Sequence, residues 1–117
     1  MTADELQVVV ETTDDDVVVI RVRGSLDGWS APSGLVEALE AAAGSGGRLT
    51  VADLSRLEFA DSTGLHVLLN ARHRHVDAGV RLVLAGPLKT EVRRLLEVSG
   101  TLGAFTVADT VDAALTC

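Results

Sequence analysis

The sequence predicts an α/β fold in a single domain. Apolar residues make up 47% of the 117 residues and aromatic residues only 3%, so valine, leucine and alanine must fill the core, as they do in buried strands and packed helices. After two opening β-rich segments, short apolar segments alternate with segments of helical periodicity. A chain of this length can bury one core of ordinary size, and we expect one domain over residues 1–117.

The first two apolar segments predict a β-hairpin. Residues 6–10 and 17–22 are rich in valine, and the acidic residues 14–16 between them are typical of an exposed turn. We expect the second strand to end at Gly24, because glycine often marks the end of a strand. The hairpin supplies the one antiparallel pair of the predicted sheet.

The next segment predicts a helix that Ser30 caps and that has Pro32 at its second position. The glycine-rich residues 44–47 end this helix. Its apolar residues recur at the spacing of one helical face. The residues that we expect to face the core are Leu35, Val36, Leu39 and Ala43.

A short buried strand is predicted over residues 49–54, followed by an irregular segment over residues 55–60. A helix then begins at residues 61–64 and ends at Gly79. Its two sides differ in polarity, which predicts one buried and one exposed stripe. The buried stripe is Leu65, Leu68, Leu69, the stem of Arg72 and Val76, and the exposed stripe is His66, Asn70, His73 and Asp77.

The remaining elements continue the alternation. Residues 80–85 predict a buried strand, and Pro87 opens a third helix that stops before Gly100. A short strand over residues 105–108 and a short helix over residues 110–115 complete the order. Because crossovers between parallel strands are right-handed, the strands after the hairpin should form a mostly parallel sheet.

Charge and composition disfavour several classes of function. The formal net charge of −7 repels nucleic acids and anionic membranes, so we expect no direct binding to either. Cys117 is the only cysteine, which gives no support to an oxidising compartment. Residues 1–7 lack the apolar region of a signal peptide, and no apolar run is long enough to span a membrane. We therefore expect a cytoplasmic protein.

Residues 57–65 read Leu-Glu-Phe-Ala-Asp-Ser-Thr-Gly-Leu, and this run resembles the phosphorylation motif of the anti-sigma-factor antagonists, a family of STAS domains. Residues 24–27, 80–86 and 92–100 resemble a turn, a strand and a helix of the same family. Together the matches span residues 6–115. The resemblance implies the STAS fold, with a mixed, mostly parallel sheet of about five strands that opens with a β-hairpin and packs with about four helices.

The resemblance also implies a function and partners. In this family the serine after the motif aspartate accepts the phosphate, which here is Ser62, with Thr63 as a lesser candidate. The unphosphorylated protein binds an anti-sigma factor that is also its serine kinase, of the GHKL ATPase type, and so releases the sigma factor. Phosphorylation blocks this binding. A phosphatase of the PP2C type removes the phosphate.

The residue types around Ser62 suit such a switch on physical grounds. Asp61 is a favoured helix cap, and the start of a helix tolerates a phosphate because of its unpaired N–H groups and partial positive charge. Gly64 would let another protein's backbone approach closely. A phosphate would add about −1.5 to −2 charges to the surface that a partner touches. The alternative is that residues 61–64 form an ordinary helix cap.

Four further residues are candidates near this site. Asp27 is either a turn residue or lies beside Ser62 and helps to orient the attack of the kinase. Trp29 either anchors a partner or seals the edge of the core. Ser25 stands where the family often has an acid. His66, where the family commonly has glycine, could contact a phosphate on Ser62. The predicted partner-binding residues are thus Ser25, Trp29, Ser62, Thr63 and His66.

Nothing in the sequence predicts an enzyme, a cofactor or a metal site. The catalytic motifs of hydrolases, zinc proteases and P-loop proteins are absent. His73 and His75 would leave a helix in different directions, so they cannot share a metal with His66. A receiver domain is disfavoured because Lys89 is the sole lysine and is predicted on a helix. The alternatives that stay open are a non-switching STAS scaffold, a STAS subunit of an ABC lipid transporter, and a small-ligand-sensing domain.

Overall fold

A computed structural model describes residues 6–13, 15–26 and 32–116. The order of strands and helices is the predicted one, with a single 3₁₀ turn added before the last strand. The strands are β1 (Gln7–Thr12), β2 (Val17–Leu26), β3 (Leu49–Ala60), β4 (Arg81–Ala85) and β5 (Thr106–Ala108), the helices are α1 (Ser33–Ala43), α2 (Ser62–Ala78), α3 (Thr90–Val98) and α4 (Val111–Leu115), and the 3₁₀ turn is η1 (Leu102–Ala104).

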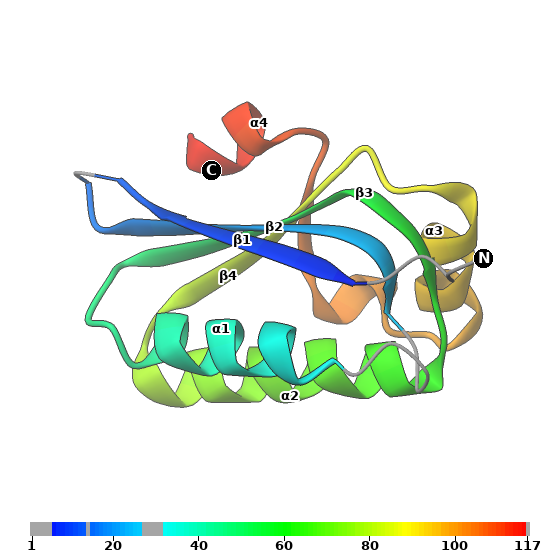
Figure 1. Ribbon diagram of the computed structural model, residues 1–117, viewed down its shortest axis with the longest axis horizontal. Helices are drawn as coiled ribbons and strands as arrows, with labels where there is room; N and C mark the ends of the chain where they lie inside the picture. Colours follow the sequence, from blue (N-terminus) through cyan, green and yellow to red (C-terminus); the bar gives the residue numbers. More distant parts are fainter. Residues whose placement is uncertain (1–5, 14, 27–31, 117) are drawn as a thin grey trace.

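The five strands form one sheet in the order β1-β2-β3-β4-β5. β1 pairs with β2 antiparallel, and the other neighbours are parallel. Helices α1 and α2 lie side by side on one face of the sheet, and α4 lies on the other (Figure 1). The predicted α/β fold with an opening hairpin is confirmed. Within the described residues, no helix is both long enough and apolar enough to cross a membrane.

The sheet separates two apolar clusters because side chains alternate between the faces of a strand. Val18, Ile20 and Val22 of β2 pack with the buried leucines of α1 and α2. Val17 and Val19 point the other way and pack with residues of β3, β4 and α4. Burying each such side chain stabilises the fold by roughly 1.5–3 kcal/mol.

Both central strands are longer than predicted. β2 does not end at Gly24, which has a φ of 99° inside the strand, but continues to Leu26. The segment 55–60, predicted to be irregular, is the second half of β3. β3 carries two extra residues relative to β2, because Arg21 pairs with Asp53 but Arg23 with Arg56, and a second shift follows Gly24. Such bulges break the alternation of apolar and polar residues, which is why this segment does not read as a strand.

Two helices begin later than predicted. Pro32 lies at the N-cap position of α1 rather than inside the helix, and no side chain caps it. The predicted cap, Ser30, lies outside the described residues. α3 begins at Thr90 rather than at Pro87, because Lys89 still has an extended backbone with a ψ of 152°. Lys89 therefore lies just before the helix and not on it.

The buried side of α2 differs from the predicted stripe. Val76 is predicted to be buried, but its side chain is 63% exposed, whereas His75 is only 1% exposed. The helix is thus rotated so that small and polar residues also face the sheet. The fully buried residues of α2 are Gly64, Leu68, Ala71 and His75, with Leu65, Leu69 and Arg72 partly buried beside them.

His75 is accommodated in the core because both of its ring nitrogens are hydrogen-bonded. Its Nδ1 lies 2.7 Å from the carbonyl oxygen of Ala71, and its Nε2 lies 2.9 Å from the hydroxyl oxygen of Thr50 on β3. A carbonyl only accepts hydrogen bonds, so Nδ1 carries the proton and Nε2 accepts from Thr50. Burial lowers the pKa of His75, although the bond to Ala71 opposes this shift.

This burial predicts that the protein loses stability in mild acid. Histidine in the unfolded chain has a pKa of about 6.5, and the pKa of folded His75 is lower, so below roughly pH 6.5 the unfolded chain binds a proton that the folded chain does not. The free energy of unfolding should fall by at most about 1.4 kcal/mol per pH unit from this group. Urea unfolding as a function of pH measures it.

The controls are His75→Gln, which removes the titration, and His73→Gln, which changes an exposed histidine of the same helix. We expect the loss of stability between roughly pH 7 and pH 5 to be smaller in His75→Gln and unchanged in His73→Gln. Equal pH dependence in all three proteins would contradict the assignment to His75.

Candidate functional site

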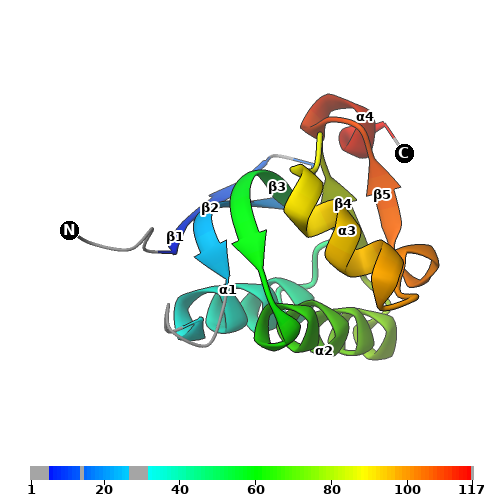
Figure 2. The same cartoon turned by 90° about the vertical axis from the view of Figure 1, so that its right-hand side faces the viewer.

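The candidate site lies where the carboxyl ends of β2 and β3 meet the start of α2. These ends come together at one end of the sheet, beside α3 (Figures 1 and 2). Leu26, the last residue of β2, pairs with Ala60, the last residue of β3. The backbone N–H of Asp61 then donates to the carbonyl oxygen of Leu26 over 3.3 Å. The start of α2 is therefore fixed to both central strands.

Asp61 caps α2, as predicted. Its backbone is extended, and its Oδ1 accepts hydrogen bonds from the N–H groups of Thr63 at 2.9 Å and of Gly64 at 3.3 Å. The carboxylate also interacts favourably with the positive end of the helix dipole. The cap leaves fewer free N–H groups than the sequence suggests, so a phosphate on Ser62 would have to displace Asp61 to use those of Thr63 and Gly64.

Ser62 is the first residue of α2, and it is exposed, whereas Thr63 is half-buried. The hydroxyl of Ser62 is thus the more accessible of the two candidate acceptors. His66 lies one turn further along α2 and is also exposed. Residues four apart on a helix are neighbours on its surface, so His66 and Ser62 lie on the same side of α2.

Gly64 is required by a close contact inside the chain. A Cβ atom at this position would lie 2.6 Å from the carbonyl oxygen of Leu26 and 2.9 Å from its Cγ. The prediction that Gly64 lets the backbone of another protein approach closely is wrong. Gly64 is buried, and the backbone that approaches it is that of Leu26 at the end of β2. Gly64 supports the site by letting α2 begin directly against Leu26.

Of the three predicted residues near the end of β2, the structure describes only Ser25. Ser25 is half-buried and pairs with Phe59 across β2 and β3. Asp27 and Trp29 lie outside the described residues. Phe59 was not singled out from the sequence, yet it is 41% exposed three residues before Ser62. The signal that could have found it is that one of the few aromatic residues of this chain stands two residues before the Asp-Ser motif.

The three histidines do not converge. His66 and His73 are exposed on α2, and His75 is buried against β3. Among the described residues, no group of three or more histidine, cysteine or acidic side chains is placed to hold a metal ion.

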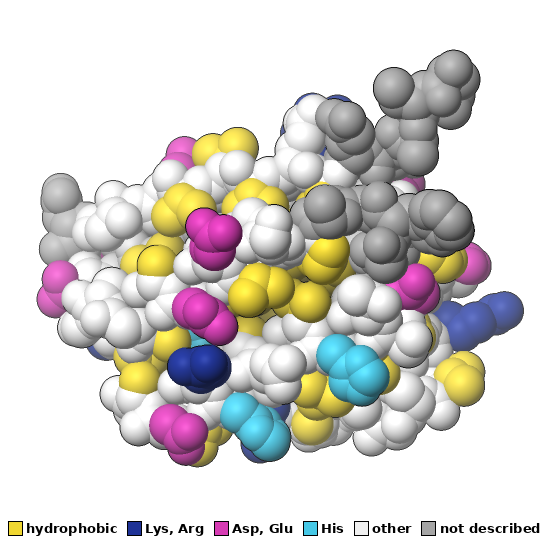
Figure 3. All heavy atoms as spheres, turned by 60° about the horizontal axis from the view of Figure 1, so that its bottom comes forward, with side chains coloured by type: hydrophobic (Ala, Val, Ile, Leu, Met, Phe, Trp, Pro, Cys, Tyr) yellow, Lys and Arg dark blue, Asp and Glu magenta, His cyan; other side chains and the backbone are white. Residues whose placement is uncertain are grey.

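A separate hollow lies further along α2. Figure 3 shows the face formed by α1 and α2, with apolar side chains in the depression between the helices and charged side chains and histidines around it. This groove has a volume of about 400 Å³, and the Arg74–Glu40 ion pair of 3.6 Å lies on its rim. Its residues on α2 begin at Val67, beyond the turn that carries Ser62, so the groove is not part of the candidate site.

The fold and the site together define a small α/β domain that presents an accessible serine at the start of a capped helix, beside the carboxyl ends of the strands of a mixed sheet. Residues 7–114 match the family model described as STAS domain. The chain belongs to the STAS domain family, which confirms the resemblance read from residues 57–65.

Two relatives and one solved structure that are similar to this chain carry names of anti-sigma factor antagonists. The chain is 34% identical over 100 residues to BtrV of Bordetella bronchiseptica, provisionally named an anti-sigma factor antagonist, covering 86% of this chain and 84% of that protein. It is 33% identical over 95 residues to the anti-sigma-B factor antagonist of Listeria monocytogenes, covering 81% and 82%. A crystal structure of an anti-sigma factor antagonist from Mycobacterium paratuberculosis superposes with a TM-score of 0.84 at 29% identity, covering 98% and 95%.

The contact at Gly64 predicts that Gly64→Ala destabilises the protein. The added methyl group meets the backbone carbonyl oxygen and the buried side chain of Leu26, which cannot move aside easily, and overpacking of this kind costs about 1–3 kcal/mol. Gly34→Ala in α1 is the matched control, because a Cβ there has no atom within 4 Å and should be neutral or stabilise by up to about 1 kcal/mol. Urea unfolding would contradict the prediction if both variants behaved alike.

The cap at Asp61 gives a second prediction. Asp61→Ala removes the acceptor for two N–H groups and should lower the free energy of unfolding by about 1 kcal/mol. Asp61→Asn keeps an oxygen acceptor and should lose less. Thermal and urea unfolding of the two variants measure this difference, and an equal loss in both would show that the hydrogen bonds of the cap are not what stabilises this end of α2.

Proposed function

We propose that the chain is an anti-sigma factor antagonist whose binding to an anti-sigma factor is switched by phosphorylation of Ser62. The observation that carries the proposal is that Ser62 is exposed at the first residue of α2, a helix whose start is capped by Asp61. Membership of the STAS family and the names of the relatives support the same function. The protein acts as a binding switch rather than as an enzyme, and it works in the cytoplasm.

The charge of the phosphate is the physical basis of the switch. Ser62 directly follows Asp61, whose carboxylate is already engaged with the N–H groups of Thr63 and Gly64. A phosphate would add about −1.5 to −2 charges beside this carboxylate. A partner that fits the neutral hydroxyl would then face a concentrated negative charge, so binding is lost through repulsion and desolvation.

The fold does not need to change for this block to act. Ser62 is exposed, and its side chain has no hydrogen bond to any other described residue, so a phosphate breaks no hydrogen bond within the described part of the chain. The partner-binding surface then comprises the residues around the start of α2. Its described members are the exposed Phe59, Ser62 and His66 and the half-buried Ser25 and Thr63.

The types of kinase and phosphatase proposed for this switch come from the resemblance to the anti-sigma-factor antagonists. An anti-sigma factor of the GHKL ATPase type would both bind the unphosphorylated surface and phosphorylate Ser62, and a phosphatase of the PP2C type would reset it. Phe59 is a suitable apolar contact for the bound state, because aromatic side chains are enriched at the centres of interfaces. His66, one turn from Ser62, is available to contact the phosphate.

The test is intact-mass spectrometry after incubation with ATP and the candidate anti-sigma kinases of the same genome. We expect one added phosphate in the wild type and in Thr63→Ala, and none in Ser62→Ala. Ser33→Ala is the matched control, because Ser33 is likewise an exposed serine at the first residue of a helix, and it should still gain the phosphate.

Binding completes the test. Ser62→Asp should weaken binding to the anti-sigma factor by more than about tenfold, which corresponds to about 1.4 kcal/mol, whereas Ser62→Ala should bind as the wild type does. Isothermal titration calorimetry measures both. Stable binding to a partner without phosphorylation by any kinase would instead favour a STAS scaffold or a transporter subunit.

A further inference from the structure

A second surface lies on the face of the sheet opposite α1 and α2. Helix α4 packs against β3, β4 and β5, and no described helix covers the same face of β1 and the adjoining part of β2. This open area is hollowed into a shallow groove of about 410 Å³, a volume within the range of small-ligand pockets. The polar and apolar side chains that line it are Gln7, Val9, Arg21, Arg23, Asp53 and Arg56.

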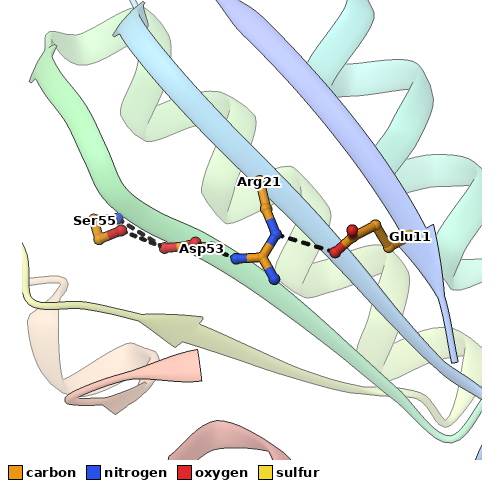
Figure 4. A network of polar contacts seen from close by, with 4 residues as sticks. All are labelled: Glu11, Arg21, Asp53 and Ser55. Carbon is orange, nitrogen blue, oxygen red and sulfur yellow. Dashed lines mark hydrogen bonds and ion pairs between the residues drawn. The ribbon is translucent and has the colours of Figure 1, made fainter. Parts of the chain in front are cut away.

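A network of ion pairs forms one side of the groove (Figure 4). Arg21 donates from Nε to Glu11 on β1 and from Nη1 to Asp53 on β3, both at 3.0 Å. The other oxygen of Asp53 accepts from the backbone N–H of Ser55 at 3.0 Å and from its hydroxyl at 2.7 Å. These bonds fix the guanidinium of Arg21 across three strands. Its Nη2 donates to no other described residue and is free for a ligand.

The first bulge of β3 places a further arginine in the groove. Without the extra residue, strand alternation would direct Arg56 to the face opposite that of Asp53. With it, Arg56 pairs with Arg23 of β2 and lines the same groove as Asp53. Leu54 and Leu57 correspondingly both point into the core under α1 and α2. The hydrogen bonds of Asp53 to Ser55 span this bulge and hold it.

Arg23 and Arg56 are an unfavourable pair in the isolated domain. Both are exposed, they are cross-strand neighbours of like charge, and such pairs destabilise a sheet. Neither has an ion pair with any described residue. Three arginines and two acids, Glu11 and Asp53, give the area a net charge of +1 in a chain whose formal net charge is −7. An anion bound between the two arginines would relieve their repulsion.

We propose that this groove binds a small organic anion, whose carboxylate or phosphate group lies between Arg23 and Arg56 and whose apolar body lies on Val9. Guanidinium groups pair with carboxylates and phosphates through two parallel hydrogen bonds. The lining residues extend across three strands, roughly 10 Å from β1 to β3, instead of along the free edge of β1. This layout fits a compact molecule lying across the sheet better than a peptide strand added to its edge.

The test uses phenyl phosphate and benzoate as probes at constant ionic strength, followed by the amide resonances of the ¹⁵N-labelled protein. We expect saturable shifts at Val9, Arg23 and Arg56. The double variant Arg23→Gln/Arg56→Gln should bind the probes at least about tenfold more weakly. Arg94→Gln is the matched control, because Arg94 is an exposed arginine on α3, and its affinity should equal that of the wild type.

Further measurements separate loss of probe binding from loss of folding, and separate this site from the proposed switch at Ser62. The double variant should unfold at the same temperature as the wild type or slightly higher, because it removes two opposed like charges. Inorganic phosphate should bind more weakly than phenyl phosphate, and equal binding would overturn the contact assigned to Val9. Shifts that do not saturate, or that persist unchanged in the double variant, would overturn the site. Ser62→Asp should leave probe binding unchanged.

Discussion

The candidate site depends on the close contact between the end of β2 and the start of α2. Leu26 is fully buried, its carbonyl accepts from the N–H of Asp61, and only a glycine at position 64 leaves room for it. This contact ties the helix to the sheet before its first turn is complete. The orientation of Ser62 is therefore set by the rigid centre of the sheet rather than by a loop, which gives a partner a preorganised surface.

The sequence predicted those features that local patterns determine. The valine-rich hairpin, the alternation of strands and helices, and the Asp61 cap each depend on residues close together in the chain. The features it missed depend on distant residues. His75 is buried because Thr50, on another strand, satisfies its Nε2, and Gly64 is needed because of Leu26. The end of β3 did not read as a strand because its bulges interrupt the alternation on which the prediction relied.

The sheet gives the two surfaces different physical characters. The surface around Ser62 lies at the end of the strands and combines an exposed serine with the Asp61 carboxylate. Under the proposed function, added negative charge there weakens the binding of a partner. The groove on the open face carries paired arginines and a fixed ion network, so negative charge is attracted there. Under the two proposals made above, one small domain presents two surfaces that respond in opposite ways to an anion, and neither response requires a change in its backbone.

The two bulges of β3 also affect how this part of the chain can change in length. Each bulge lets two successive residues face the same side of the strand, so Leu54, Leu57 and Ala60 all point into the core at intervals of three residues. Loss of one residue from a bulge would restore regular alternation there and leave the residues on either side facing as before. Each bulge can therefore absorb a change of one residue in length without turning Ala60 outward or displacing the start of α2.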